Sequence, residues 1–571
     1  MNVAQQLVQQ LIDAGVSHIY GIVGDSLNPI VDAVRKSGGS AKGGIDWIHV
    51  RHEEGAAFAA AAEAQLTGKL AVCAGSCGPG NLHLINGLYD AQRSGAPVLA
   101  IASHIPTVQI GQTYFQETHP DRLFNECSVY NEMVSTAAQC PRVVNAAIRH
   151  AVELKGLPGD ISDQKATGHA PKYVPARSSV IAPNSEDVRE LAELLNRSKK
   201  VAIFAGAGVE GAHDEVIALA DKLKAPVGHT LRGKDFIQYD NPFDVGMTGL
   251  LGYGAAAEGM NDADVLIMLG TDFPYNQFLP GKCTVQVDSH AEKLGRRTDV
   301  SLAIHSDIKE LIKQLLPKLN GDRSDSFLKG KLKKHAKLMN APVGSYTRNA
   351  EKLKPIHPEY AAHVLNEVAA KDAVFTADTG MCNVWTARYI DPLGTRRLIG
   401  SFLHGSMANA LPHAIGAQVA YPGRQVTSVS GDGGLSMLLG ELVTARMYDL
   451  PINVVVFNNS TLGMVKLEML VNGLHDVNYA KIAEAAGFHA QRVDDPKDLR
   501  DAFSQAFAHN GPSLVEVITD PNALSLPPEI KGEQMIGFAT AMSKVVLNGG
   551  AGEAIAMATS NMRNIPRLDQ F

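Results

Sequence analysis

Val426 to Asn459 reads VTSVSGDGGLSMLLGELVTARMYDLPINVVVFNN. Within it, two apolar runs at 426–430 and 452–457 have the length of buried strands, and a helix-length stretch separates them. This order is typical of a βαβ unit, in which two parallel strands flank a crossover helix. The stretch therefore predicts a parallel sheet with helices packed on its faces.

The same alternation recurs along the chain, with further strand candidates at 47–50, 70–74, 98–102, 201–205 and 265–269. At 571 residues the chain is too long for one hydrophobic core. Polar, proline-bearing stretches around 168–185 and 340–358 are candidate linkers. We predict an α/β protein with three doubly wound parallel-sheet domains and a C-terminal tail, over residues 1–175, 180–340, 355–530 and 531–571.

Composition narrows the class of partner. Hydrophobic residues make up 45% of the chain and charged residues 19%, with a net charge of -7 at pH 7, which argues against nucleic acid as a partner. The six cysteines show no zinc-type spacing and are expected to be buried thiols in a reducing cytosol. The N-terminus lacks the order of a signal peptide, and no apolar run is long enough to span a bilayer. We expect a cytoplasmic protein that acts on small molecules, with peripheral contact to the inner face of the cell membrane left open.

Polar side chains follow two of the predicted strands. Asp432 follows the first in Gly431-Asp432-Gly433-Gly434, and Asn459 follows the second. Ligands of doubly wound sheets bind at the carboxyl ends of the strands, so we expect these side chains to lie together. Their oxygens suit Mg²⁺, which completes its coordination with phosphates and water, and the glycines allow a diphosphate to approach the next helix. A lone glycine motif is more often a tight turn, but the asparagine at the next strand end favours a site.

This paired motif resembles the thiamine-diphosphate motif of the superfamily that contains acetohydroxyacid synthases, pyruvate oxidases and pyruvate decarboxylases. The similarity extends over essentially the whole chain. It is greatest to the flavin-dependent pyruvate oxidases, especially the quinone-reducing type also called pyruvate dehydrogenase (quinone). The resemblance implies a pyrimidine-binding first domain, a central FAD-binding domain and a third domain that binds diphosphate and Mg²⁺.

The resemblance also implies a set of cofactor contacts in the third domain. Mg²⁺ would be held by Asp432, Asn459 and the carbonyl of Thr461. Met407 would separate the two cofactor rings and hold them bent, whereas without the resemblance it would be a core methionine. The other residues implied to bind thiamine diphosphate here are Gly405, Ser406, Gly433, Gly434, Ser460, Leu462, Gly463, Met464 and Val465.

Glu53 lies between the strand candidate 47–50 and an alanine-rich helix predicted at 56–64. Its spacing alone favours an acidic residue stabilised by the helix dipole. The resemblance instead makes Glu53 the acid that hydrogen-bonds a pyrimidine nitrogen of the cofactor, so that the cofactor's amino group can deprotonate the thiazolium carbon. Such an acid belongs in a dry pocket, where burial raises its pKa. Glu54 is then structural.

Glu53 and Asp432 fall in different predicted domains, so one cofactor must bridge two domains. In the resembled family these two domains come from different subunits. The resemblance therefore implies a homo-oligomer, with a dimer as the minimal active form and a tetramer as the usual one.

The substrate side of the site is expected around Gly75 to His83, a short loop with three glycines that follows a strand. His83 alone would more often be a satisfied surface or core histidine, and Phe115 and Gln116 could equally be core residues. The resemblance places all three beside the substrate.

The central domain carries Gly206 and Gly208 in a glycine turn after the strand candidate 201–205, a pattern common in α/β proteins. The resemblance assigns FAD to this turn and to later segments. A carboxylate at a strand end, such as Asp288, suits hydrogen bonds from ribose hydroxyls. The remaining residues implied to bind FAD are Thr248, Gly249, Leu250, Leu251, Thr271, Asp272, Phe273, Pro274, Tyr275 and Asp307.

The reaction implied by the resemblance is oxidative decarboxylation of pyruvate or a similar small 2-oxo acid to acetate and CO₂, with electrons passed through FAD to a quinone. One alternative is a carboligase like acetolactate synthase, in which FAD is structural. Another is an oxygen- and phosphate-dependent pyruvate oxidase that makes acetyl phosphate. A catalytically idle relative is disfavoured because Glu53, Asp432 and Asn459 are all present.

Three stretches depart from the resembled enzymes or extend beyond the domains. Met464 stands where those enzymes have an aromatic residue linked to flavin reduction, and the stretch 154–160 and the loop at 468–475 are short. In the tail, a helical spacing of apolar residues predicts either a packed helix or a segment that contacts membrane lipid. These residues are Met535, Phe538, Met542 and Val545.

Overall fold

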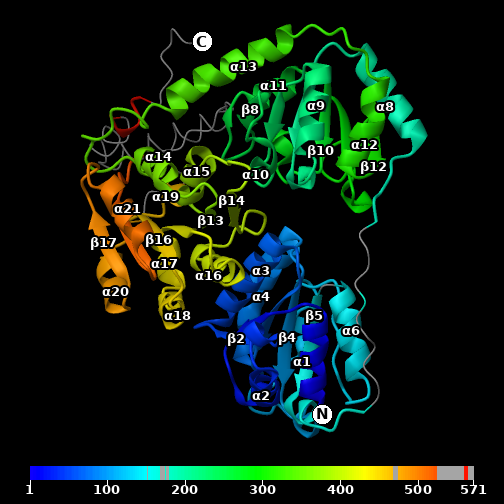
Figure 1. Ribbon diagram of the computed structural model, residues 1–571, viewed down its shortest axis with the longest axis vertical. Coiled ribbons are helices and arrows are strands. Elements are labelled where there is room, and N and C mark those ends of the chain that lie inside the picture. The colour runs from blue at the N-terminus through cyan, green and yellow to red at the C-terminus, as the bar shows by residue number, and fades with distance from the viewer. Residues whose placement is uncertain (151, 168–173, 175–178, 467–472, 524–558, 564–571) are drawn as a thin grey trace.

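The computed structural model describes residues 1–571 except 151, 168–173, 175–178, 467–472, 524–558 and 564–571. Three α/β domains, each built on its own sheet, follow one another along the chain (Figure 1). The first is blue to cyan, the central one blue-green to green and the third yellow-green to orange. Among the described residues, no helix has both the length and the apolar character needed to cross a bilayer. The predicted fold class is confirmed.

The first domain is a parallel sheet in the order β2-β1-β3-β4-β5. Alternate side chains of its strands enter two separate cores, because successive residues of a strand point to opposite faces. One face packs on α1, α2 and α6, and the other on α3 and α4. The bounds are α1 Val3–Asp13, β1 His18–Gly21, α2 Asn28–Ser37, β2 Asp46–His49, α3 Glu53–Thr67, β3 Ala71–Gly75, α4 Pro79–Ser94, β4 Val98–His104, α6 Cys140–His150 and β5 Val152–Pro158.

The central domain has the sheet order β12-β11-β10-β6-β7-β8-β9. Its last pair, β8 and β9, is antiparallel, so this sheet is mixed rather than wholly parallel as predicted. The short connection from Met247 to Tyr253 leaves no room for a crossover helix, which a parallel pair would need. The bounds are α8 Ser185–Arg197, β6 Val201–Ala205, α9 His213–Leu223, β7 Val227–His229, α10 Lys234–Ile237, β8 Asp244–Met247, β9 Tyr253–Gly254, α11 Ala256–Asp262, β10 Val265–Leu269, β11 Cys283–Asp288, β12 Leu302–His305, α12 Ile308–Leu315 and α13 Ser326–Leu338.

The third domain is a parallel sheet in the order β14-β13-β15-β16-β18-β17. Because β13, β15 and β16 are neighbours, their carboxyl ends meet at one edge of the sheet. The bounds are α14 Pro358–Val368, β13 Val374–Ala377, α15 Met381–Tyr389, β14 Arg397–Gly400, α16 Ala410–Ala420, β15 Val426–Gly431, α17 Asp432–Met437, α18 Glu441–Met447, β16 Ile452–Asn458, α19 Gly463–Lys466, α20 Tyr479–Ala485, β17 His489–Val493, α21 Leu499–Ala508 and β18 Ser513–Ile518.

All seven strands predicted from the sequence form, within two residues of their expected ends. The short stretch 154–160 still contributes to a strand, β5, although its pairing with β4 contains register shifts. The predicted alanine-rich helix begins earlier than expected, at Glu53. The apolar tail residues at 535–545 lie outside the described residues.

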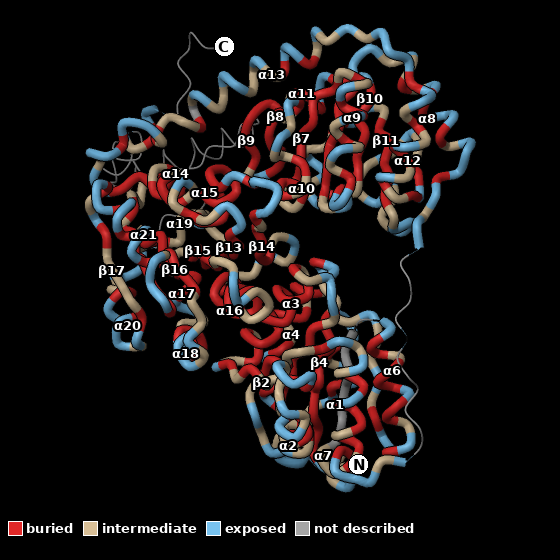
Figure 2. The backbone as a smooth tube through the Cα atoms, viewed as in Figure 1, coloured by how far each residue is buried: buried red, intermediate tan, exposed pale blue. Residues whose placement is uncertain are grey.

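The first and third domains share one hydrophobic core, formed by α3 and α4 on one side and by α16, α18 and α20 on the other. Figure 2 shows α3, α4 and α16 as a largely buried block between the two domains. A Cβ on Gly416 of α16 would overlap the carbonyl of Ala59 in α3. Small residues on both helices therefore permit the close contact that fixes the two domains relative to each other.

His357, just before α14, joins this fold to the last described segment of the chain. It is 3% exposed, its ring stacks on Tyr346 with centroids 3.7 Å apart, and burial lowers its pKa to about 3. Arg563 lies over the other ring of the stack, with its guanidinium 5.2 Å from the Tyr346 centroid. As the pH falls below the ordinary histidine pKa, the unfolded chain takes up a proton that the folded chain excludes, so stability is lost between about pH 6.5 and pH 3.

We therefore expect His357→Phe, which keeps the stacked ring but cannot take up a proton, to be more resistant to acid than the unmodified protein. At pH 5 the relative gain should be about 2 kcal/mol, since each pH unit between the two pKa values is worth about 1.4 kcal/mol. Thermal unfolding midpoints at pH 7.5 and pH 5 would measure it, with the exposed His119→Phe as control. An equal acid shift in all three proteins would refute the assignment.

Candidate active site

The carboxyl ends of β15 and β16 bring Asp432 and Asn459 together. The two strands are paired up to Gly431 and Phe457, and Asp432 is the first residue of α17. Its carboxylate accepts hydrogen bonds from the backbone N–H groups of Gly433 and Asn459. Asp432 is 3% exposed, and burial raises its pKa to about 6. A buried carboxylate at a strand edge, with an amide oxygen beside it, fits a divalent cation.

The loop after β16 is ordered by its own asparagine pair. The side chain of Asn458 donates to Glu516 at 2.7 Å, which ties the loop to β18. The side-chain oxygen of Asn459 accepts from the backbone N–H of Thr461 at 3.1 Å, and this bond turns the chain beside Asp432. Asn458 is thus structural, while Asn459 and the Thr461 backbone lie where the metal ligands were predicted.

Three predicted cofactor segments converge on Gly433. A Cβ at this position would lie 2.6 Å from Leu462 and 3.6 Å from the Met407 side chain. The segments around 405–407, 432–434 and 459–463 therefore meet at one place. Glycine at 433 is required by this packing, because a Cβ there would overlap the Leu462 side chain.

A third strand end contributes Asp378, which sequence reasoning missed. It follows β13, is fully buried, and its carboxylate accepts hydrogen bonds from the Ala410 N–H at 2.9 Å and the Asn409 side chain at 3.2 Å. Burial raises the pKa of Asp378 to about 6. A Cβ on Gly434 would overlap its other oxygen. The available signal was its position directly after a strand, which is the same as that of Asp432.

Glu53 is the first residue of α3 and is 6% exposed. Its carboxylate lies 2.9 Å from Nδ1 of His83, and the His83 ring stacks on His52 with centroids 4.3 Å apart. A Cβ on Gly80 would lie 2.9 Å from the other carboxylate oxygen, so glycine leaves that oxygen accessible from the loop. The structure thus places His83 beside Glu53. A role of His83 toward the substrate stays a prediction.

The start of α3 is held from the third domain by Glu441, a second residue that sequence reasoning missed. Its carboxylate accepts the backbone N–H groups of Arg51 and His52, each at 3.0 Å. Glu441 is fully buried, and burial raises its pKa. The residue after these two amides is Glu53, so a contact between domains fixes the backbone from which Glu53 projects.

The predicted substrate residues differ in their surroundings. Gln116 adopts a φ of 62°, and its side chain accepts from the Cys77 thiol at 3.3 Å, beside the Gly75–Gly80 loop. Phe115 is 78% exposed in the single chain, and its role beside the substrate stays a prediction. Met464 is half-buried and packs against the core of the third domain.

The glycine turn of the central domain has a structural explanation. A Cβ on Gly208 would lie 2.6 Å from Gly270, and a Cβ on Gly206 would lie 2.5 Å from Thr271. The two loops pack backbone to backbone, with a hydrogen bond from the Gly208 N–H to the Gly270 carbonyl at 3.0 Å. The glycines are required by this loop contact and give no separate evidence for a dinucleotide.

The other predicted flavin residues gather at the same edge of the central sheet. The hydroxyl of Thr248 is buried and has no hydrogen-bond partner among the described residues, which fits a missing ligand. A Cβ on Gly249 would lie 2.9 Å from Phe273, which joins two of the segments. Leu251 and Tyr275 are half-buried, whereas Leu250 and Pro274 are exposed.

The three predicted flavin carboxylates already have partners. Asp272 forms ion pairs with Arg296 and Arg297. Asp288 accepts from the His290 N–H at 2.9 Å, and Asp307 accepts from the Ile181 N–H at 2.5 Å. Each carboxylate retains further acceptor capacity, so these contacts leave a role toward a ligand open.

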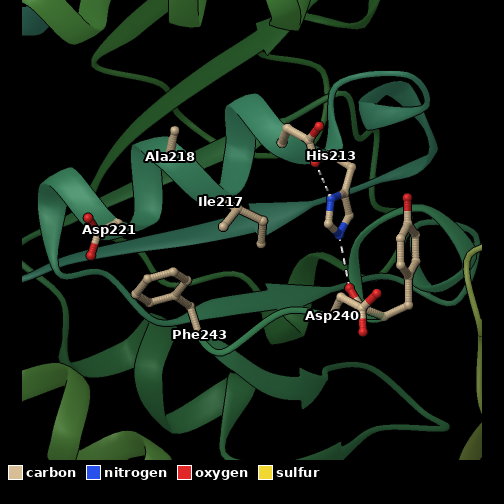
Figure 3. Close-up of a pocket in the computed structure, with 8 residues that line it drawn as sticks. His213, Ile217, Ala218, Asp221, Asp240 and Phe243 are labelled. Atoms are coloured by element: carbon tan, nitrogen blue, oxygen red, sulfur yellow. Dashed lines mark hydrogen bonds and ion pairs between the residues drawn. The ribbon is translucent and has the colours of Figure 1, made fainter.

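A separate cavity of about 580 Å³ lies on the central domain, between α9 and the loop that precedes β8 (Figure 3). The His213 ring bridges Asp214 and the Tyr239 carbonyl and stacks on the Tyr239 ring. None of the predicted site residues lines this cavity.

Three family models match the chain in the order of its sheets. The "Thiamine pyrophosphate enzyme, N-terminal TPP binding domain" covers residues 1–123, the central domain covers 188–315, and the C-terminal TPP binding domain covers 378–517. Together with the fold, these matches define the class. The chain belongs to the thiamine pyrophosphate enzyme family, and the resemblance stated from the sequence is confirmed.

Several individual proteins are similar to this chain over most of its length. The "Putative thiamine pyrophosphate-containing protein YdaP" of Bacillus subtilis is 36% identical and covers 95% of both chains. A protein named pyruvate oxidase from Lactiplantibacillus plantarum is 31% identical, over 88% of this chain and 86% of the relative. A protein named acetolactate synthase large subunit from Lactococcus lactis is 30% identical, over 94% and 96%.

Proposed function

We propose that the protein decarboxylates pyruvate or a similar small 2-oxo acid, with the uptake of one water molecule, to acetate and CO₂ and passes the two electrons through FAD to a quinone. The observation that carries this proposal is the convergence of Asp432, Asn459 and the Thr461 backbone with the Met407 and Leu462 side chains around Gly433. The similarity to a pyruvate oxidase over most of both chains supports the choice of substrate.

Each cofactor-binding residue has a proposed task. Asp432, Asn459 and the Thr461 carbonyl hold Mg²⁺, and Gly433 and Gly434 let the backbone approach a diphosphate. Bound thiamine diphosphate supplies a carbon nucleophile and an electron sink for the pair released when CO₂ leaves. Met407 lies beside Gly433 and would pack against the bound cofactor.

Glu53 has the proposed task of an acid in a dry site. Its carboxyl group donates a hydrogen bond to the pyrimidine ring and so controls the proton on the cofactor's amino group. His83, at 2.9 Å, orients this carboxyl group, and Glu441 fixes the backbone before it. Burial of Glu53 excludes water that would compete for the proton.

The domains and the oligomer follow from the same proposal. Residues 1–175 bind the pyrimidine, 180–340 bind FAD and 355–530 bind the diphosphate and Mg²⁺, with the tail at 531–571 as a candidate lipid contact. Because the resembled family builds each site from these two domains of different subunits, we propose that Glu53 and Asp432 meet across two subunits of a dimer, within a tetramer. The exposed Phe115 side chain is available to such a partner.

Flavin bleaching tests the proposed reaction. Under anaerobic conditions, pyruvate should bleach the FAD absorbance of the purified holoenzyme within a few turnovers, and a soluble quinone should restore it, because electrons leave the substrate as a pair through the flavin. The carboligase alternative, favoured by relatives named acetolactate synthase, instead predicts almost unchanged absorbance with acetolactate as product.

Further arms of this experiment separate the remaining alternatives. Phosphate-dependent formation of acetyl phosphate with oxygen would indicate the oxygen-type reaction. A higher rate of quinone reduction when anionic lipid vesicles are added would support membrane contact by the tail, and an unchanged rate would contradict it.

A further inference from the structure

One face of α4 carries three polar side chains that contact α3 or the third domain. His83, Asn86 and Asp90 recur at intervals of three and four residues, so they lie on the same side of the helix. His83 contacts Glu53, and Asp90 lies 3.3 Å from His413 of α16. Asn86 lies between these two contacts on the same helix.

The amide of Asn86 makes three hydrogen bonds to two domains. Its nitrogen donates to the Glu54 carboxylate at 2.6 Å and to the Ser406 hydroxyl at 2.9 Å, and its oxygen lies 2.8 Å from Nε2 of His404. Glu54 is the second residue of the helix that begins with Glu53. One half-buried amide therefore joins the activating helix to the loop that precedes Met407.

Apart from Asn86, α4 contacts the Ser406 loop through Tyr89, whose ring stacks on His404 with centroids 5.6 Å apart. The hydrogen bonds of Ser406 to its own domain are local. The Ser406 N–H donates to the Ser401 hydroxyl at 3.0 Å, and the Asn409 side chain donates to the Ser406 carbonyl at 2.8 Å. Gly405 has a φ of 80°, a conformation that lets the loop turn sharply. Movement of Ser406 would carry Met407 away from Gly433, where the predicted cofactor segments meet.

We propose that Asn86 is a positioning residue that fixes the Ser406–Met407 segment of its own chain against α4 through its bonds to Glu54, Ser406 and His404. The proposal rests on the proposed function, because its consequence is the binding of thiamine diphosphate. An amide suits this place because it donates two hydrogen bonds and accepts others at once, which neither a carboxylate nor an aliphatic side chain can do.

Binding of thiamine diphosphate with Mg²⁺, followed by the quenching of protein fluorescence, tests the proposal without relying on turnover. Asn86→Leu should weaken binding about tenfold, which corresponds to the loss of one or two neutral hydrogen bonds. Asn196→Leu is the matched control, since Asn196 makes two hydrogen bonds near the end of α8 in the central domain. It should bind like the unmodified protein.

Exchanging the donor and the acceptor between Asn86 and Glu54 distinguishes a positioning role from a general loss of structure. Asn86→Asp places a carboxylate against Glu54 and should weaken binding at least as much as Asn86→Leu. Adding Glu54→Gln supplies the missing donor from the other side and should restore the affinity to within about threefold of the unmodified protein, because the same contact re-forms with its polarity exchanged. Glu54→Gln alone keeps an acceptor for Asn86 and should have a small effect.

The outcomes separate two kinds of failure. If the unmodified protein does not bind thiamine diphosphate, the proposed function is wrong. If it binds and Asn86→Leu binds equally well, or if the double variant is no better than Asn86→Asp, the role of Asn86 is wrong. If Asn86→Leu does not fold, the comparison of Asn86→Asp with the double variant decides the question.

Discussion

Replacement of Glu53 by glutamine is expected to lower thiamine-dependent decarboxylation of pyruvate by about 10²- to 10⁴-fold, the range typical for loss of a general acid or base. Glutamine fills the same space beside His83 but cannot donate and take back a proton. Binding of thiamine diphosphate should change much less, because the proposed metal and diphosphate contacts lie in another domain. Turnover of the reconstituted enzyme and a binding titration measure the two quantities separately.

Glu54→Gln provides the matched control for this variant, since it alters the next carboxylate on the same helix. It should retain turnover within about threefold, because the new side chain still accepts the hydrogen bond from Asn86. Equal losses in the two variants would show that any charge change at the start of α3 is damaging, and the activating role of Glu53 would be withdrawn.

Replacement of Asp432 by alanine is expected to weaken thiamine diphosphate binding by at least about 100-fold, because removal of one partner from a buried charged contact costs about 3–5 kcal/mol. Isothermal titration with Mg²⁺ present would measure the loss. Raising the Mg²⁺ concentration should recover part of the affinity. The exposed ion pair of Asp495 with Lys354 supplies the control, and Asp495→Ala should bind normally.

Unchanged affinity in Asp432→Ala would contradict the assignment of this carboxylate as a metal ligand. Chelation gives an independent check on the same point. Removal of divalent cations from the unmodified protein should release the cofactor, and Mg²⁺ should restore binding, since a cation held by Asp432 and Asn459 would also bind the diphosphate.

The strands and the metal-site candidates could be predicted because their signals are local. Each predicted strand is an apolar run of strand length, and Asp432 and Asn459 each follow such a run within two residues. In a parallel sheet, neighbouring strands end at the same edge, so sequence position was enough to place these side chains together. The register between β15 and β16 agrees with that reasoning.

The residues that were missed act through contacts between distant parts of the chain. Glu441 reaches the backbone of Arg51 and His52, and Asn86 reaches Ser406, across domain boundaries that no local pattern reveals. The glycine turn at 206–208 shows a different limit, and its assignment to FAD stays a prediction. Close packing against Gly270 explains both glycines, and a sequence pattern does not distinguish a contact with another loop from a contact with a ligand.

Complementation between two inactive chains tests most directly whether one site is shared by two subunits. Chains carrying Glu53→Gln and chains carrying Asp432→Ala would be produced together and purified as a mixture of dimers. If Glu53 of one subunit serves the Asp432 site of the other, each hybrid dimer contains one intact site, and activity should return to about a quarter of the unmodified level. If hybrid dimers form and the mixture stays inactive, the proposal of a site between subunits is contradicted.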